Sequence, residues 1–240
     1  ETGGRVSTTY SANITVPLDE IPDLLIPAAI DTVLMVSIVM VVVLVVGVPL
    51  GALIHNLAPG GLFARRSLHT PLSWVISIGR SLPFLVLMTA IIPFTRLVTG
   101  TNIGIAAAVV PMSIAGIAFF TRIVENSLRS VPASTIDVAR ASGGSNAQII
   151  WKAQVPEALP SIVGGLTINT IAMIEYSTIA GTIGAGGLGY VAVTYGYQRF
   201  DQGVMVATII VLIVTVAVIQ VAGDALARSL NPVTSRRVNH

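Results

Sequence analysis

Five long apolar segments, separated by polar stretches, dominate the 240 residues of this chain. The first runs from Thr32 to Ile54 without a charged residue, and its 23 residues can cross a hydrocarbon core of roughly 30 Å. The others are expected at about 72–92, 103–120, 161–180 and 204–223. The pattern predicts an all-α, polytopic membrane protein with five transmembrane helices.

The segments differ in what interrupts them. The second is broken by Arg80 and Pro83, and residues 93–102 after it are expected to form a short connection. The third is rich in glycine and alanine, which let neighbouring helices approach closely in lipid, and Pro111 is expected to kink it. The fourth passes into a glycine-rich run at 181–189, which should unwind or pack closely.

Three parts of the chain follow from these bounds. Residues 1–31 are polar and then interrupted by prolines, which predicts an N-terminal arm ending in a surface-lying turn. Residues 32–228 contain the five spans, and Asp31 and Thr32 are suited to capping the first helix. Residues 229–240 form a polar tail.

The longest polar stretch, residues 131–160, has the pattern of two short helices around a turn. Ser134 and Asp137 have the spacing of a capping box, which predicts a helix start. Gly143 and Gly144 predict its end near residue 142, because glycine tolerates the left-handed conformation of a helix terminus. An amphipathic loop lying on the bilayer surface is the alternative.

A second short helix should follow this turn. Ser145 or Asn146 is suited to capping its start. Pro156 and Pro160 are expected to end it before the fourth span. The stretch 131–160 would then be a compact loop on which another protein could dock.

Composition and charge fix the environment and the orientation. The chain is 53% hydrophobic and only 10% charged, against about 25% charged residues in soluble domains. If the N-terminus lies outside, the segments on the inner side hold nine of the 13 basic residues and the segments on the outer side hold three. The remaining one, Arg80, lies within a span. The inner nine are Arg65, Arg66, Arg122, Arg129, Arg140, Lys152, Arg228, Arg236 and Arg237. The positive-inside rule therefore places 131–160 and the C-terminus in the cytoplasm.

Several kinds of chemistry find no support in the sequence. Without cysteine there is no thiolate metal site or thiol nucleophile, and the three histidines lack ligand spacing. Thirteen basic against 11 acidic residues give no nucleic-acid surface. Gly184, Gly186 and Gly189 satisfy G-x-G-x-x-G, but they follow an apolar helix instead of a strand. No phosphate-binding loop is present, so energy for any transport must come from another subunit or an ion gradient.

The loop at 131–160 resembles the one shared by permease subunits of binding-protein-dependent ABC importers. The likeness rests on Asp137-Val138-Ala139, on Gly143 six residues after the acid, and on Val155-Pro156. Asp137 replaces the family's Glu, and Val138, Ala153 and Val155 replace its usual Ala, Ile and Leu. Further motifs, RSLPF at 80–84, IPFTR at 92–96, PEALP at 156–160 and GAGGLG at 184–189, resemble the methionine-importer permeases.

This resemblance implies partners and roles. It implies a homodimer in a bacterial plasma membrane, two ABC ATPase subunits that carry ATP and Mg, and an extracytoplasmic substrate-binding protein or lipoprotein. The chain itself would be no enzyme and would hold no cofactor or metal. Residues expected to couple to the ATPase are Ile136, Asp137, Ala139, Arg140, Gly143, Gly144 and Pro156.

Arg80 and Glu175 are the ionisable residues predicted within spans. An isolated charge near the bilayer centre costs about 2.5–3.5 kcal/mol on insertion scales, so each should face protein or a water-filled cavity. With Tyr176 and Ser177 they are candidates for the translocation path, where Arg80 could attract an amino acid's carboxylate. The alternative for both is a structural contact between helices.

Three other functions remain open from the sequence. A permease of the same architecture could carry another small organic solute. An ion-driven secondary transporter should show internal repeats, which are not visible in five spans. A purely structural membrane protein would give no reason for a compact helix-turn-helix loop.

Overall fold

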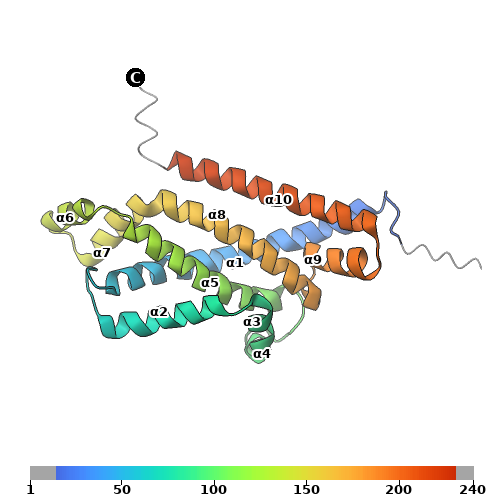
Figure 1. Ribbon diagram of the computed structural model, residues 1–240, viewed down its shortest axis with the longest axis horizontal. Coiled ribbons are helices and arrows are strands. Elements are labelled where there is room, and N and C mark those ends of the chain that lie inside the picture. The colour runs from blue at the N-terminus through green and yellow to red at the C-terminus, as the bar shows by residue number, and fades with distance from the viewer. Residues whose placement is uncertain (1–14, 231–240) are drawn as a thin grey trace, which may run out of the picture.

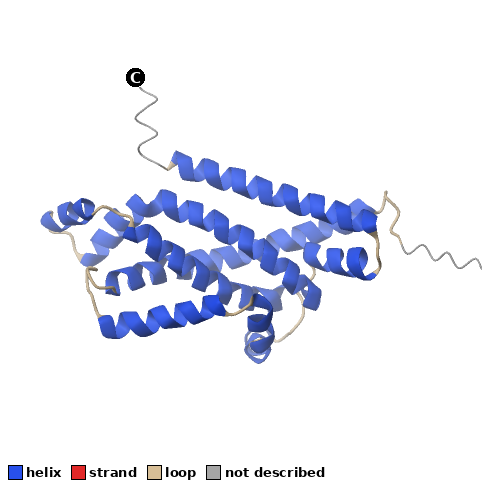
Figure 2. Cartoon of the chain, viewed as in Figure 1, coloured by secondary structure: helices blue, strands red, loops and turns tan. Residues whose placement is uncertain are grey.

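The structure is a computed structural model that describes residues 15–230, and all regular elements in this range are helices (Figures 1 and 2). The α-helices are α1 (Ile21–Leu57), α2 (Arg66–Ser81), α3 (Phe84–Ala90), α4 (Ile92–Thr99), α5 (Ile105–Arg129), α6 (Ala133–Ala141), α7 (Asn146–Ile149), α8 (Val155–Ala180), α9 (Gly187–Val191) and α10 (Gln202–Ser229). Three π-helical stretches, Ile150–Gln154, Gly181–Ala185 and Ala192–Gln198, adjoin α7, α8 and α9. The predicted N-terminal arm up to residue 14 and the tail from 231 lie outside the described residues.

Four helical segments are long and apolar enough to cross a membrane: α1, α5, the continuous run Asn146–Ala185, and α10. A fifth span results if α2 and α3, which meet at a bend of 106°, count as one. The bend falls at Leu82 and Pro83, the place where the sequence predicted an interruption. The all-α membrane architecture is therefore confirmed.

Helix α5 lies at the centre of the bundle, between α1, α8 and α2 (Figure 1). Close approach depends on glycine. A Cβ atom at Gly116 would lie 2.7 Å from Val43 of α1 and 3.2 Å from the sulfur of Met173 of α8. Around these contacts, Phe120 and Met112 are fully buried. The small residues predicted to permit close helix packing do so.

Helix α1 begins eleven residues earlier than the predicted span, at Ile21 instead of Thr32. The turn expected before residue 32 is therefore wrong. Ile21, Leu25 and Ala28 are buried in a cluster with residues of α9 and α10, and this packing outweighs the helix-weakening effect of Pro27. Thr32 lies inside α1 and does not cap it; its hydroxyl instead accepts a hydrogen bond, at 2.9 Å, from the Leu188 N–H in the first turn of α9.

Two further bounds differ from the prediction. The connection expected at 93–102 contains helix α4, which ends at Gly100 with a left-handed φ of 74°. Helix α5 runs unbroken through Pro111 and continues past residue 120 to Arg129. It continues because Glu125, which is only 1% exposed, is paired with arginines three and four residues away.

The glycine-rich run after α8 unwinds and packs closely, as predicted. Gly184 and Gly186 have φ of 99° and 83°, which interrupt the helix between α8 and α9. At Gly189 a Cβ atom would lie 2.3 Å from the Thr178 backbone. Figure 1 places this turn and α9 at one end of the bundle, with α6, α7 and the end of α10 at the other.

Candidate functional site

The helix pair α6 and α7 projects from one end of the bundle (Figure 1). No residue of α6 is buried. The helix ends at Ser142, and Gly143 follows with φ 78°, a conformation that favours glycine. A Cβ atom at Gly144 would lie 2.9 Å from the Ala139 carbonyl oxygen. The predicted glycine turn is therefore present, and both glycines are needed to form it.

The starts of these two short helices differ from the prediction. Helix α6 begins directly after Pro132, so Ser134 already lies within its first turn, and the capping box predicted from Ser134 and Asp137 is wrong. A capping box is present at α7 instead. The Ser145 hydroxyl accepts a hydrogen bond from the Gln148 N–H, and the Gln148 side chain accepts one from the Ser145 N–H.

The prolines that follow α7 do not end the helix. Pro156 lies in the first turn of α8 and Pro160 lies inside α8. The π-helical stretch Ile150–Gln154 precedes them, and the Val155 N–H bonds to the Ile150 carbonyl five residues back. This wider turn joins α7 to α8 as one continuous helical run.

One face of α6 looks back onto its own chain. Ile136, Asp137 and Arg140 line a cleft of about 220 Å³. Ala133 of α6 also lines it, and its other walls come from the end of α1, the loop after it and the π-helical stretch: His55, Gly60, Gly61, Leu62 and Gln154. Ile136 and Ala139, predicted to supply an apolar docking surface, are half-buried.

The opposite face of α6 is open. Val138 is 67% exposed, the most exposed of the large apolar side chains on this helix. Ser134 and Ala141 lie on the same side, four residues before it and three after it, and both are exposed. Sequence reasoning missed Val138 as a contact residue, although its helical spacing from Ser134 and Ala141 was visible.

A buried amide pair connects the helix pair to α1. Asn56 and Gln154, 98 residues apart, are 0% and 3% exposed. The Asn56 amide donates to Gln154 Oε1 at 2.9 Å, and the Gln154 amide donates to Asn56 Oδ1 at 3.2 Å. Asn56 also donates to the Ala52 carbonyl at 2.9 Å. Gln154 also lines the cleft, so the amide pair links the wall of the cleft to α1.

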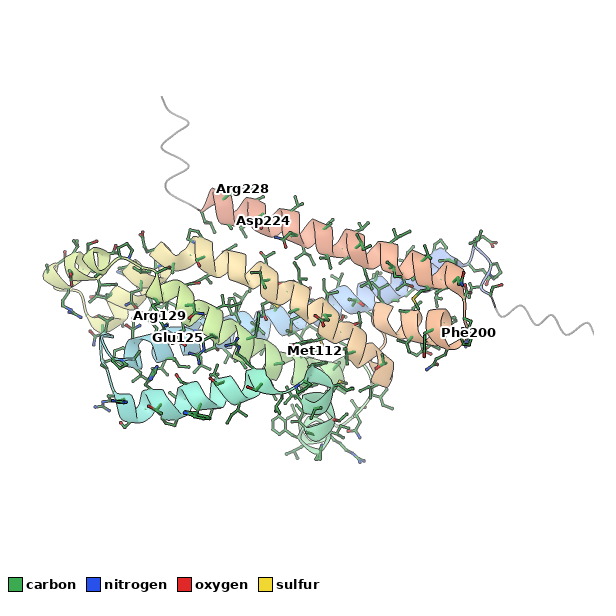
Figure 3. The ribbon with its side chains drawn as sticks, in the orientation of Figure 1. Met112, Glu125, Arg129, Phe200, Asp224 and Arg228 are labelled. Atoms are coloured by element: carbon green, nitrogen blue, oxygen red, sulfur yellow. The ribbon has the colours of Figure 1, made fainter. Side chains whose placement is uncertain are left out.

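Glu125, near the C-terminal end of α5, forms a second group of polar contacts. Figure 3 shows it beside Arg129. Its carboxylate pairs with Arg122 and, at 2.9 Å, with Arg129. Arg122 also donates to the Ser77 hydroxyl of α2 at 3.0 Å. The junction therefore ties α2 to α5.

The four residues predicted for a translocation path do not meet at one point. The Arg80 side chain is exposed on α2 and lies 5.8 Å from the centre of the Phe119 ring. Glu175 is exposed on α8 and lines a groove against α10. Among residues 15–230, no ion pair joins Arg80 to Glu175.

The two neighbours of Glu175 have structural contacts. Tyr176 stacks on Phe84 of α3 with ring centres 4.4 Å apart and planes 1° from parallel. Ser177 is buried, and its hydroxyl donates to the Ile174 carbonyl at 2.6 Å. In the described part of the chain, no group of three or more His, Asp or Glu side chains is placed to hold a metal ion.

A bundle of membrane-length helices that presents an exposed helix pair at one end defines a polytopic membrane protein. The family model of the binding-protein-dependent transport system inner membrane component matches residues 47–235, and the chain belongs to that family. It is accordingly an inner membrane component of a transport system, a permease subunit.

Relatives of similar length exist. The probable D-methionine transport system permease protein MetI of Vibrio cholerae is 45% identical over 87% of this chain and 93% of its own length. The corresponding protein of Pasteurella multocida is 38% identical over 83% and 92%.

Solved structures show the same arrangement. A structure of the MetNI methionine ABC transporter in an inward-facing conformation matches with a TM-score of 0.87 and 37% identity, over 89% of this chain and 99% of that one. An amino acid ABC transporter solved with histidines, 20% identical with a TM-score of 0.71 over 90% and 99% of the two chains, shares the fold.

Proposed function

We propose that this chain is the permease subunit of an ATP-driven importer for methionine or a related amino acid, working by alternating access. The observation that carries the proposal is the exposed pair α6 and α7, hinged at Gly143, in a chain 45% identical to a D-methionine permease over nearly its whole length. The cargo is taken from the names of these relatives.

The proposed assembly has several parts. Two copies of the chain form a homodimer with the path at their two-fold interface, and two ABC ATPase subunits, which bind ATP and Mg, dock on the α6 end. An extracytoplasmic substrate-binding protein or lipoprotein delivers cargo at the α9 end. The N-terminus then lies outside and the C-terminus in the cytoplasm, in agreement with the basic residues near α6.

The structure refines how docking would act. Val138 supplies the exposed apolar contact of α6, and the charges of Asp137 and Arg140 orient it. Gly143 and Gly144 set the angle between α6 and α7, while Pro156 starts the rod of α8. Closure of the ATPase pair would move α6, and the Asn56–Gln154 pair would transmit this movement to α1.

The candidate path residues take different roles in this proposal. Arg80 and Glu175, both exposed, line the path. Tyr176 and Ser177 support the wall behind Glu175, because one stacks on Phe84 and the other bonds to its own helix.

The test is purification of the chain with its ATPase, followed by methionine uptake into vesicles. Gly143→Leu should leave ATP hydrolysis active and lower methionine transported per ATP at least about tenfold, because a left-handed leucine is strained and tilts α6. Gly100→Leu is the matched control, with φ 74°, an equally open environment and a position away from α6. Normal uptake by Gly143→Leu would refute the coupling role, and competition by other solutes would test the cargo.

A further inference from the structure

Several helices leave a face uncovered, and the face of α8 differs in chemistry from those of α1 and α10. The uncovered faces of α1 and α10 are mostly aliphatic, as expected of surfaces that meet lipid; they include Val33, Val41, Val45, Ile210, Val218 and Val221. Four uncovered positions of α8 and the turn after it are spaced seven residues apart, and three of them are polar: Ser161, Ile168, Glu175 and Thr182. Pro156, Glu157 and Ile183 are uncovered as well.

A glycine lies on this same face of α8. A Cβ atom at Gly164 would meet no atom within 4 Å. Packing within the chain therefore does not require a glycine there. Small residues of this kind permit close approach of something outside the chain. The polar face of α8 therefore has room for close approach of a second copy or of cargo.

Glu175 is the centre of this face and lies in a groove of about 550 Å³ between α8 and α10. The other walls are mostly aliphatic: Ile171, Ile174, Thr178, Leu212, Ile213, Val216, Ala217 and Gln220. The Gln220 amide donates to Asp224 at 2.9 Å, so it is already engaged. Among residues 15–230 the Glu175 carboxylate has no hydrogen bond or ion pair.

This combination defines the chemistry of an occupant. An ionised carboxylate at membrane depth requires a cation or a water-filled cavity, since leaving it in hydrocarbon costs several kcal/mol. An aliphatic groove of this volume is in the size range of small-molecule sites and favours an apolar group. A molecule with a cationic end and a short apolar chain satisfies both requirements.

We propose that Glu175 and the α8–α10 groove form a cargo subsite in the translocation path. The Glu175 carboxylate binds the α-ammonium group of an amino acid, and Leu212 and Val216 contact its apolar side chain. This inference rests on the proposed importer function and adds to it the group that recognises the cargo inside the membrane. It also explains why a carboxylate is placed where the neighbouring helix faces are aliphatic.

The test measures binding to the purified permease–ATPase complex without the binding protein, so that only sites in the membrane contribute. The probes are radiolabelled methionine and its des-amino analogue, 4-(methylthio)butanoate. Glu175→Gln should weaken methionine binding about 10- to 100-fold, because a charge-assisted hydrogen bond is lost. Glu175→Asp should retain part of the affinity. The analogue, which lacks the ammonium, should bind wild type and Glu175→Gln equally weakly.

Glu157→Gln is the matched control, an exposed carboxylate on the same helix outside the groove. It should bind methionine as wild type does. The subsite is refuted if wild type shows no saturable methionine binding, or if Glu175→Gln binds it unchanged. It is also refuted if Glu175→Gln weakens the analogue as much as methionine. ATP-driven uptake by wild type, measured separately with the binding protein, reports on the importer function whichever result is obtained.

Discussion

The two ends of the bundle are held together by different kinds of contact. At the α6 end, side chains connect the helices: Asn56 with Gln154, and Glu125 with Arg122 and Arg129. At the α9 end, the closest contact is between backbones, where Gly189 packs on Thr178, and the Leu188 N–H adds a hydrogen bond to the Thr32 hydroxyl.

This difference has a mechanical consequence. Hydrogen bonds between side chains can exchange partners or rotate without disturbing a helix, so an end connected by them can change its arrangement. Backbone contact at a glycine has no comparable freedom, because any shift meets hard-sphere overlap. The α6 end is thus suited to respond to a docked protein, and the α9 end to keep α1, α8 and α9 in fixed relation.

The largest effect is expected from breaking the backbone contact at the α9 end. Gly189→Ala places a Cβ atom 2.3 Å from the Thr178 backbone, a distance that only movement of α9 can relieve. We expect a loss of about 3 kcal/mol in stability, at the upper end of the usual cost of overpacking, and a correspondingly lower melting temperature in detergent. Val206→Ala, at a 56% exposed position of α10, is the control and should change stability little. An unchanged melting temperature for Gly189→Ala would contradict the rigid packing of this end.

The sequence predicted the spans and the turn after α6, but it did not predict the side-chain contacts at the α6 end. Apolar segment lengths identified the spans, and Gly143 with Gly144 identified the turn after α6, because both signals are local. The amide pair was not predicted. Its members are 98 residues apart, and each is an ordinary polar residue at the edge of an apolar segment.

The errors in the candidate site also have a physical origin. Ser134 and Asp137 match the capping-box spacing, yet the helix begins directly after Pro132, two residues earlier than that motif predicts. Ile136 was expected to contact a partner because it is apolar, but it half-buries itself in the cleft and leaves Val138 outside. Which face of a short helix is open depends on packing that local sequence does not encode.

An intermediate effect is expected at the amide pair. Asn56→Ala leaves the buried Gln154 amide without its partner, which should lower stability by about 1–3 kcal/mol and reduce methionine transported per ATP. Gln154→Ala should act similarly, and the double variant should lose much less than the sum, because each single change already breaks the same contact. Thermal unfolding in detergent and the transport ratio together measure this coupling. Additive losses would show that the two side chains act independently.

The smallest effect is expected at Asp201, whose polar contacts add to the glycine packing at the α9 end. Asp201 caps α10 through the Val204 N–H at 3.1 Å and accepts a hydrogen bond from the Val16 N–H at 2.6 Å, which ties the start of the described chain to α10. The hydrogen bonds from Val16 and Val204 lower the pKa of Asp201 below its ordinary value, against the opposing effect of burial.

Because the pKa of Asp201 is lower in the folded protein, its carboxylate stabilises the fold at pH values above the unfolded-state pKa of about 3.9. This contribution is lost as the pH falls through the folded-state pKa. Asp201→Asn retains the ability to cap α10 but cannot ionise, so it should be less stable than wild type at pH 7 by about 1 kcal/mol or less. The difference should shrink as pH falls below about 3.9 and disappear once Asp201 is protonated in the folded protein as well. Equal stability of the two at pH 7 would show that the charge on Asp201 does not hold this end, which would then depend on glycine packing alone.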